Sequence, residues 1–515
     1  MSMEEKKINF YNRNKTDKIQ LMTEGEIIIP DINPDIYRIL KTDENAVVDS
    51  VKAEEGRICI EGRLAVDVLY YGKRSEGALS FAKQEFPFED CIYDESIREN
   101  ADADVITEII HTDYRIINDR KIGVRSVTGI KALWTNMDEK TALSAEGEND
   151  DGILAKTGVL NTGTAVERKA DELKISERLV IPPDRPDIGQ IVDVTADVCH
   201  RDARMMAEGV QIKGDARVNL LYMSAEDFMP ASAEFLLPFS GTMETETAED
   251  LITVARIEPK RVSAVLTADE NGEPRAADAD ITLGVVVKLF GRKTVPILED
   301  AYSLSEKVEV ESEEVEYMEV FGRNRAQGTF RTTVYTEGQP PVMQIVSLRG
   351  KIRSGSVNVG EGIINAEGVA DMKLMYVAED DNAPLYVIEE SIPFSQSVEM
   401  KGVNENMDVD VHIETEDTGF GLLSENEVEI RITLGFDACV CEKKKCRIIK
   451  SIERSEEDSS AKGGAVIYTV KKGDTLWDIA KKYHSTPSDI EKLNGEDENE
   501  LVKEGRRILI FKKFL

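Results

Sequence analysis

Residues Ile60-Glu-Gly-Arg-Leu-Ala-Val-Asp-Val-Leu-Tyr-Tyr71 occur in this chain in three related copies. The second copy reads Ile212-Lys-Gly-Asp-Ala-Arg-Val-Asn-Leu-Leu-Tyr-Met223, and the third lies around Glu367-Gly-Val-Ala-Asp-Met-Lys-Leu-Met-Tyr376. In every copy a glycine stands eight residues before a tyrosine, as in the pairs Gly62/Tyr70, Gly214/Tyr222 and Gly368/Tyr376. Copies lie about 152 residues apart, which is too long for a solenoid unit and suits a whole domain.

Further landmarks keep the same register in all three copies. A proline precedes each glycine at a constant spacing, a Pro-Phe pair follows each tyrosine at a nearly constant one, and a glycine marks each closing segment: Pro34, Pro186 and Pro340; Pro87, Pro238 and Pro393; Gly129, Gly284 and Gly435. These residues can have packing roles, with the glycine at a bulge or close strand contact, the proline at a strand end and the tyrosine as a ring in the core. Alternatively, they can line a ligand pocket that the copies share. We favour the packing interpretation.

Within each copy apolar residues alternate with polar ones. Val428, Ile430, Ile432, Leu434 and Phe436 occupy every second position, which is the period of a half-buried strand. Amphipathic helical patterns are scarce before residue 465. We therefore predict a mainly β protein, with three tandem antiparallel β-sandwich or barrel-like repeat domains followed by a small βααβ (α+β) domain.

The domain boundaries follow from the landmarks and from local composition. We expect an N-terminal tail at 1–13 and three β repeats at 14–140, 165–295 and 318–450. Acidic connectors at 141–164 and 296–317 separate the repeats. A flexible linker of small polar residues at 451–464 then leads to a terminal module at 465–513.

Charge and cysteine content narrow the class of partner. The net charge is −35, whereas residues 465–515 carry 10 basic and 9 acidic side chains, so a nearly neutral module follows a strongly acidic body. We therefore expect neither nucleic acid as a partner nor insertion of the chain into a membrane.

The N-terminus lacks a signal-peptide pattern, and the six cysteines are sparse. We expect a cytoplasmic protein with free thiols that is not secreted by a signal peptide.

The terminal module has a pattern of its own, starting with Tyr468-Thr-Val-Lys-Lys-Gly-Asp-Thr-Leu-Trp-Asp-Ile-Ala-Lys-Lys-Tyr483. Its first part alternates like a strand, and its second part has helical periodicity. Asp474 or Thr475 is suited to cap that helix, and Thr486 precedes a proline at the start of a second one. A late strand with Ile508 and Ile510 completes the order strand, helix, helix, strand.

These residues closely resemble the LysM domain over about 48 positions. In that family a groove between the Gly-Asp-Thr-Leu turn and the loop after the second helix binds glycans that contain N-acetylglucosamine. The resemblance places a binding site, for protein or glycan, at Gly473, Asp474, Thr475, Leu476, Trp477, Leu493 and Asn494. The sequence departs from the family pattern after Asn494, where residues 495–500 are unusually acidic and a Lys-Glu-Gly approach replaces the usual Pro-Gly.

Trp477 lies at the edge of the apolar stripe of the first predicted helix. It is either a half-buried core ring or an exposed aromatic anchor, the residue type most enriched at interface hot spots. We predict that Trp477→Glu abolishes partner binding while the module stays folded.

The whole arrangement resembles the clostridial spore-coat morphogenetic proteins of the SipL type, which carry SPOCS domains. Residues 26–36 and 177–188 carry this likeness, and the third copy is degenerate there. It implies a scaffold in the mother cell that tethers the coat basement layer, a coat ATPase, to the forespore surface through LysM, with other coat proteins as further partners and self-association as an open question. The alternative is LysM-mediated binding of peptidoglycan from the cell wall or spore cortex.

An enzyme is not expected. The chain has no phosphate-binding loop, zinc-protease motif or nucleophile elbow, and its four histidines are not near a patterned nucleophile. No cofactor is expected. The one metal-like cluster is Cys439, Cys441 and Cys446, which lacks a local fourth ligand. Exposed or edge-strand thiols are the favoured interpretation there, with a metal site or redox crosslinking as the alternative.

Overall fold

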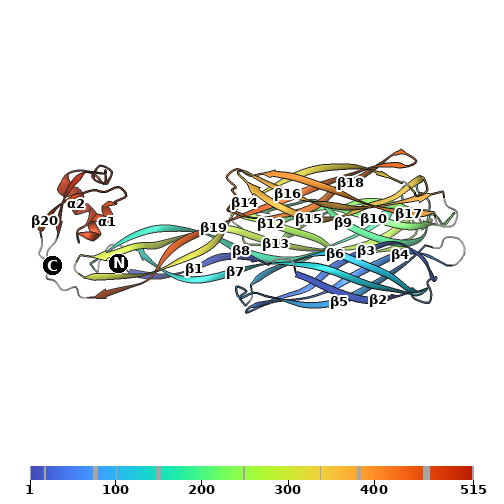
Figure 1. Cartoon of the computed structure of the whole chain (residues 1–515), viewed down its shortest axis with the longest axis horizontal. Coiled ribbons are helices and arrows are strands. Elements are labelled where there is room, and N and C mark those ends of the chain that lie inside the picture. Colours follow the sequence, from blue (N-terminus) through green and yellow to red (C-terminus); the bar gives the residue numbers. More distant parts are fainter. Residues whose placement is uncertain are drawn as a thin grey trace.

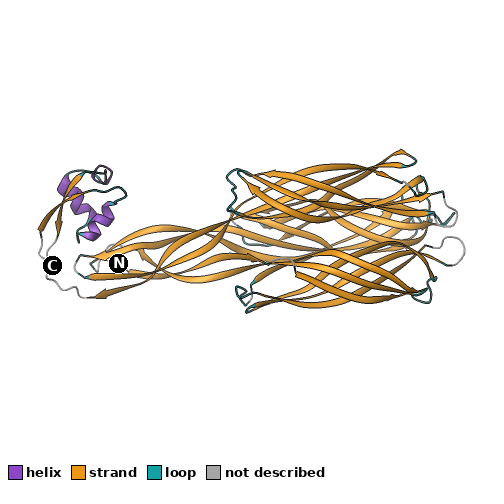
Figure 2. Ribbon diagram, viewed as in Figure 1, coloured by secondary structure: helices purple, strands orange, loops and turns teal. Residues whose placement is uncertain are grey.

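The computed structural model shows a body of three β domains, a narrow stalk and a small terminal module beyond the tip of the stalk (Figure 1). It describes residues 2–16, 19–73, 79–99, 101–146, 152–247, 250–304, 306–336, 338–379, 384–455 and 464–512. The described helices all lie in the terminal module, and strands dominate the rest (Figure 2). None of these helices has the length and apolar character that crossing a membrane requires. The predicted fold class is confirmed.

Each repeat consists of two antiparallel sheets. The first repeat contains β1 (Ser2–Lys15), β2 (Ile19–Ile28), β3 (Ile36–Glu54), β4 (Arg57–Gly72), β5 (Leu79–Tyr93), β6 (Asp102–Asn118) and β7 (Lys121–Glu146). One sheet has the order β3-β4-β5, and in the other β7 pairs with β1, β2 and β6. Inward side chains of both sheets form one apolar core, which makes the repeat a β-sandwich.

The second and third repeats have the same plan. The second contains β8 (Ile153–Val180), β9 (Ile188–Met206), β10 (Gly209–Ser224), β11 (Pro230–Met243), β12 (Ile252–Thr267) and β13 (Ala276–Ser303), in sheets β11-β10-β9 and β12-β13-β8. The third contains β14 (Lys307–Tyr335), β15 (Val342–Gly360), β16 (Ile363–Ala378), β17 (Leu385–Glu399), β18 (Asp408–Ser424) and β19 (Glu427–Ser455), in sheets β15-β16-β17 and β14-β19-β18.

The repeated glycine is covered by the phenylalanine of the repeated Pro-Phe pair. In each copy these two residues are partners on the second and third strands of one sheet: Gly62 and Phe88, Gly214 and Phe239, Gly368 and Phe394. A Cβ atom on the glycine would lie 2.6, 2.7 or 2.5 Å from the ring in the three copies. Only glycine therefore leaves room for the ring.

The repeated tyrosine hydrogen-bonds to the repeated proline. Its hydroxyl donates to the proline carbonyl at 3.1, 2.9 and 3.2 Å, in the pairs Tyr70 and Pro34, Tyr222 and Pro186, and Tyr376 and Pro340. All three rings are fully buried. The landmarks thus contact one another inside each sandwich, which supports the packing interpretation over a shared ligand pocket.

The stalk is made of segments that we expected to be a tail and connectors. The paired strands β1 and β7, β8 and β13, and β14 and β19 run on from the sandwiches and share an apolar core. It contains residues from all six strands: Ile8, Phe10, Ala142, Leu160, Val295, Ile297, Val315, Tyr317 and Ile448.

Residues 2–13 of the expected tail are therefore strand, and so are 141–146 and 153–164 of the first connector and 296–303 and 307–317 of the second. Their acidic composition was misleading, because the carboxylates occupy alternate positions: Glu309 and Glu311 are exposed beside half-buried Val308 and Val310. Residues 147–151 of the first connector lie outside the described residues. Of the expected linker, 451–455 belongs to β19, and 456–463 also lies outside.

The terminal module has the predicted order with one addition. It contains β20 (Gly464–Thr469), α1 (Leu476–Lys482), α2 (Pro487–Asn494), α3 (Glu498–Leu501) and β21 (Arg507–Lys512), with β20 and β21 paired antiparallel. The short α3 falls in the acidic segment after Asn494, where Asp497 caps it by accepting a hydrogen bond from the backbone N–H of Glu500. Buried Leu501 anchors α3 to the core.

Candidate functional site

The Gly-Asp-Thr turn of the terminal module is held by its own hydrogen bonds. Gly473 has a φ of 92°, which favours glycine. The Asp474 carboxylate accepts hydrogen bonds from the Lys471 backbone N–H at 2.8 Å and from the Tyr468 hydroxyl at 2.7 Å. These two donors lower the pKa of Asp474. The carboxylate thus has a structural role in closing the turn.

Thr475 and Leu476 begin α1 as the sequence predicted. The Thr475 hydroxyl accepts a hydrogen bond from the backbone N–H of Asp478 at 3.1 Å, so Thr475, and not Asp474, is the N-cap. Leu476 is 1% exposed and belongs to the module's core. The Leu476 side chain is therefore shielded from solvent, whereas exposed Thr475 uses its hydroxyl to cap α1.

Asn494, at the end of α2, joins this helix to β21. Its amide nitrogen donates to the carbonyls of Ile490 and Leu509, both at 2.8 Å. Its amide oxygen accepts from the backbone N–H of Leu509 at 2.9 Å. The neighbouring Leu493 is half-buried. Both residues of this predicted pair are half-buried, and they differ in that the Asn494 amide is engaged in hydrogen bonds within the domain.

We expect Asn494→Ala to destabilise the terminal module by about 1–3 kcal/mol, because the change leaves polar backbone groups of Leu509 and Ile490 without their partners. Hydrogen exchange of residues 464–512 in the full chain measures the effect. Ser488→Ala, in the first turn of the same helix, is the matched control. Normal protection together with lost ligand binding would instead make Asn494 a contact residue.

Trp477 contacts the stalk. Its indole N–H donates to Asp300 Oδ2 at 2.9 Å, and its ring meets that of Tyr302 edge-on with centroids 4.9 Å apart. Lys481, one turn later on α1, donates to Asp300 Oδ1 at 2.6 Å. Partial burial acts to raise the pKa of Asp300, but the hydrogen bonds from Lys481 and Trp477 outweigh it and lower that pKa.

The sequence reasoning missed Asp300 and Tyr302, which lie near the end of β13. Both fall in the segment 296–317 that its acidic composition assigned to a connector. Buried Val295 and Ile297 alternate with exposed neighbours just before them, and this pattern could have indicated a strand. No local signal pointed to a contact with the terminal module, which follows only after the whole third repeat.

The three candidate cysteines occupy two different surroundings. Cys439 and Cys441 lie where β19 pairs on both sides, with β14 and with β18, so the prediction of exposed or edge-strand thiols is wrong for these two. Cys441 is 1% exposed. A hydrogen bond from Cys439 lowers the pKa of Cys441, and Arg13 adds to this at 3.8 Å from its sulfur. Cys446 packs against the core of the stalk, and burial raises its pKa to about 11.

Cysteine chemistry elsewhere in the chain also differs from expectation. Cys59 and Cys91 are cross-strand partners on β4 and β5 and form a disulfide, so the expectation that all six thiols are free is wrong. Cys199 and the three cysteines above are free. Over the described residues, histidine, cysteine and carboxylate side chains nowhere gather in a group of three that could hold a metal ion.

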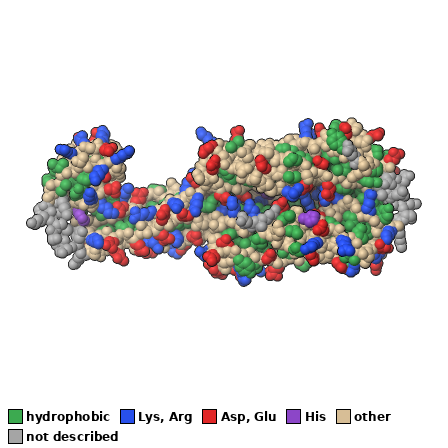
Figure 3. All heavy atoms as spheres, viewed as in Figure 1, with side chains coloured by type: hydrophobic (Ala, Val, Ile, Leu, Met, Phe, Trp, Pro, Cys, Tyr) green, Lys and Arg blue, Asp and Glu red, His purple; other side chains and the backbone are tan. Residues whose placement is uncertain are grey.

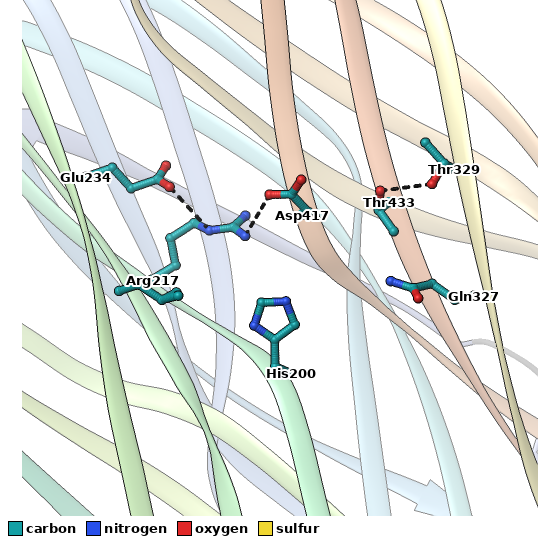
Figure 4. A pocket seen from close by; sticks show the side chains of 8 residues that line it. His200, Arg217, Glu234, Gln327, Thr329, Asp417 and Thr433 are labelled. Carbon is teal, nitrogen blue, oxygen red and sulfur yellow. Dashed lines mark hydrogen bonds and ion pairs between the residues drawn. The ribbon is translucent and has the colours of Figure 1, made fainter.

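A polar groove of about 500 Å³ lies between the second and third repeats (Figure 4). Buried Arg217, on β10, crosses it between two carboxylates, with Asp417 at 3.1 Å and Glu234 at 3.6 Å. Burial raises the pKa of Glu234. His200 also lines the groove and has a φ of 50°. Because the guanidinium is matched by carboxylates from both repeats, it ties them together.

Charged side chains also join all three repeats on their inner side, and Lys and Arg follow the seam between the two visible blocks of the body (Figure 3). Asp410 of the third repeat pairs with Arg13 of the first at 3.3 Å and with Arg256 of the second at 3.6 Å. Burial, reinforced by nearby arginines, lowers the pKa of His412 to about 3, so this histidine is neutral. The body is therefore one assembled unit.

Comparison with known families accounts for both parts of the chain. The model described as "SipL, SPOCS domain" matches residues 35–117, 187–267 and 341–423, one segment in each repeat. The LysM domain model matches residues 468–511. Searches of curated proteins and of solved structures found no significant match. These domains mark a SipL-like sporulation protein with a LysM module of the peptidoglycan-binding kind. The chain is thus a protein of the SipL type, with three SPOCS domains followed by a C-terminal LysM domain.

Proposed function

We propose that this protein is a non-enzymatic scaffold of the spore coat, which tethers the coat basement layer and its ATPase to the forespore surface through the LysM domain. The observation that carries the proposal is the joining of three SPOCS domains and one LysM domain in a single chain. The repeated landmarks support a scaffold as well, because they contact one another inside each sandwich.

The arrangement of the LysM domain favours a protein over a glycan as its partner. Asp474, Thr475 and Asn494, the polar residues of the predicted glycan groove, already hydrogen-bond within the domain. A sugar would need these groups as partners for its hydroxyls, whereas a protein can bind through aromatic and apolar side chains. Binding of peptidoglycan remains the second candidate, because the domain belongs to a family of glycan-binding modules.

The two candidates are separated by comparing the full chain with one that ends at Ser455. We expect the full chain, and not the shorter one, to retain the coat ATPase from a lysate of sporulating cells. We expect both chains to sediment equally with insoluble peptidoglycan. Sedimentation that depends on LysM, without retention of the ATPase, would instead support glycan binding.

A further inference from the structure

The LysM domain makes a specific contact with the tip of the stalk. Asp300 receives hydrogen bonds from both Trp477 and Lys481 of α1, one on each carboxylate oxygen. This arrangement uses both acceptor atoms of one side chain and requires a defined orientation of α1. Hydrogen bonds to a charged acceptor are stronger than neutral ones, so Asp300 is a directional anchor.

Tyr302 makes a second contact two residues further along β13. Its hydroxyl donates to the carbonyl of Ser485 at 2.8 Å, in the turn between α1 and α2. Tyr302 is 4% exposed and Ser485 is 1% exposed, so this hydrogen bond is shielded from water. The Tyr302 ring also belongs to the LysM core cluster, against which Leu154 and Leu304 of the stalk pack. Apolar burial and hydrogen bonds thus act on the same face of the domain.

The contact covers the residue that we predicted to bind a partner. Trp477 lies against Tyr302, with the two rings in the edge-on geometry that aromatic pairs prefer. A partner that uses the same indole must replace both the ring contact and the hydrogen bond to Asp300. Binding to the stalk and binding to such a partner are therefore mutually exclusive.

We propose that the stalk tip is a docking site for the LysM domain, formed by Asp300 and Tyr302, and that it competes with the protein partner for Trp477. The competition rests on the proposed function, whereas the docking does not. Because both surfaces belong to one chain, docking is intramolecular, and its effective concentration is in the mM range. If docking holds nine-tenths of the molecules, the apparent affinity for the partner is reduced about tenfold.

Tryptophan fluorescence of the full chain tests the docking without any partner. The chain has two tryptophans, and Trp134 is buried at 1% exposure in the first repeat, so quenching by acrylamide reports mainly on Trp477. We expect Asp300→Ala and Tyr302→Ala each to raise the acrylamide quenching constant of the chain about twofold, because the Trp477 indole becomes exposed when the LysM domain undocks. Glu299→Ala is the matched control, since this neighbouring carboxylate is exposed and pairs with Lys156.

Trp477→Glu cannot separate the two events, because it would remove the stalk contact and the partner contact together. Asp300 and Tyr302 are residues of β13, so their replacement changes no side chain of the LysM domain itself. Unaltered quenching in both of their variants would overturn the docking site. Unchanged melting of the body by circular dichroism would show that neither variant unfolds the stalk.

Retention of the coat ATPase by the same chains tests the competition. We expect Asp300→Ala and Tyr302→Ala to bind it up to about tenfold more tightly than the unaltered chain, and Glu299→Ala to bind it equally. Increased quenching with equal or weaker binding would overturn the competition. Absence of binding in every chain, including the undocked ones, would contradict the proposed function, while the quenching would still decide the docking.

Discussion

Replacement of Gly368 by alanine is expected to destabilise the third SPOCS domain by about 2–3 kcal/mol. A Cβ atom at this position would lie 2.5 Å from the backbone oxygen of Arg353 and 2.5 Å from Cζ of Phe394. Neither neighbour can give way easily, because Arg353 is paired in β15 and Phe394 is 4% exposed in the core. The added methyl group must therefore separate strands or displace the ring.

Hydrogen exchange of β15, β16 and β17 is the measurement, because a chain of several domains need not unfold in one step. Gly421→Ala in the same domain is the matched control, since a Cβ atom there has no neighbour within 4 Å. We expect it to change stability by less than about 0.5 kcal/mol. Equal protection in the two variants would contradict the role assigned to the repeated glycine.

The repeats and their strands could be predicted because period-2 alternation and a common register are local properties of the sequence. The core of the third domain follows the alternation from Val428 to Val440. The pairing of Gly368 with Phe394 was not readable in the same way, because the two residues lie on different strands, β16 and β17. Three in-register copies nevertheless indicated that the two positions belong to one arrangement.

The stalk could not be predicted from composition. Its strands alternate exposed carboxylates with buried or half-buried residues, and a high acidic content in a short window resembles a loop. Phe10 of the first repeat meets Tyr317 of the third, with ring centroids 5.5 Å apart. Such a contact depends on how three domains assemble, which no local pattern specifies.

Only part of the candidate site could be predicted, because some of its contacts also depend on how the domains assemble. A close family resemblance located the turn, the caps and the helices of the LysM domain, and the structure assigns Asp474, Thr475 and Asn494 to their internal hydrogen bonds. The environment of Trp477 depends on Asp300 and Tyr302, which lie in another domain. Contacts between domains leave no periodic signal in either segment.

Phe10→Ala is expected to destabilise the stalk by about 3–5 kcal/mol. The ring is fully buried among side chains from all three pairs of stalk strands, so its removal leaves a cavity where six strands meet. Asn9→Ala is the matched control, because its side chain is exposed at the preceding position of β1. Hydrogen exchange of β1 and of its partner β7 measures the difference.

The same variant distinguishes a stalk from a tail. A disordered N-terminal tail would tolerate Phe10→Ala without any change in the exchange of β7, and that result would contradict the structure of the stalk. The LysM domain docks on β13, and β13 shares the core cluster with Phe10. Loosening this core should therefore also expose Trp477 to quenching, whereas Asn9→Ala should leave it shielded, because the docking site depends on the strands that Phe10 holds together.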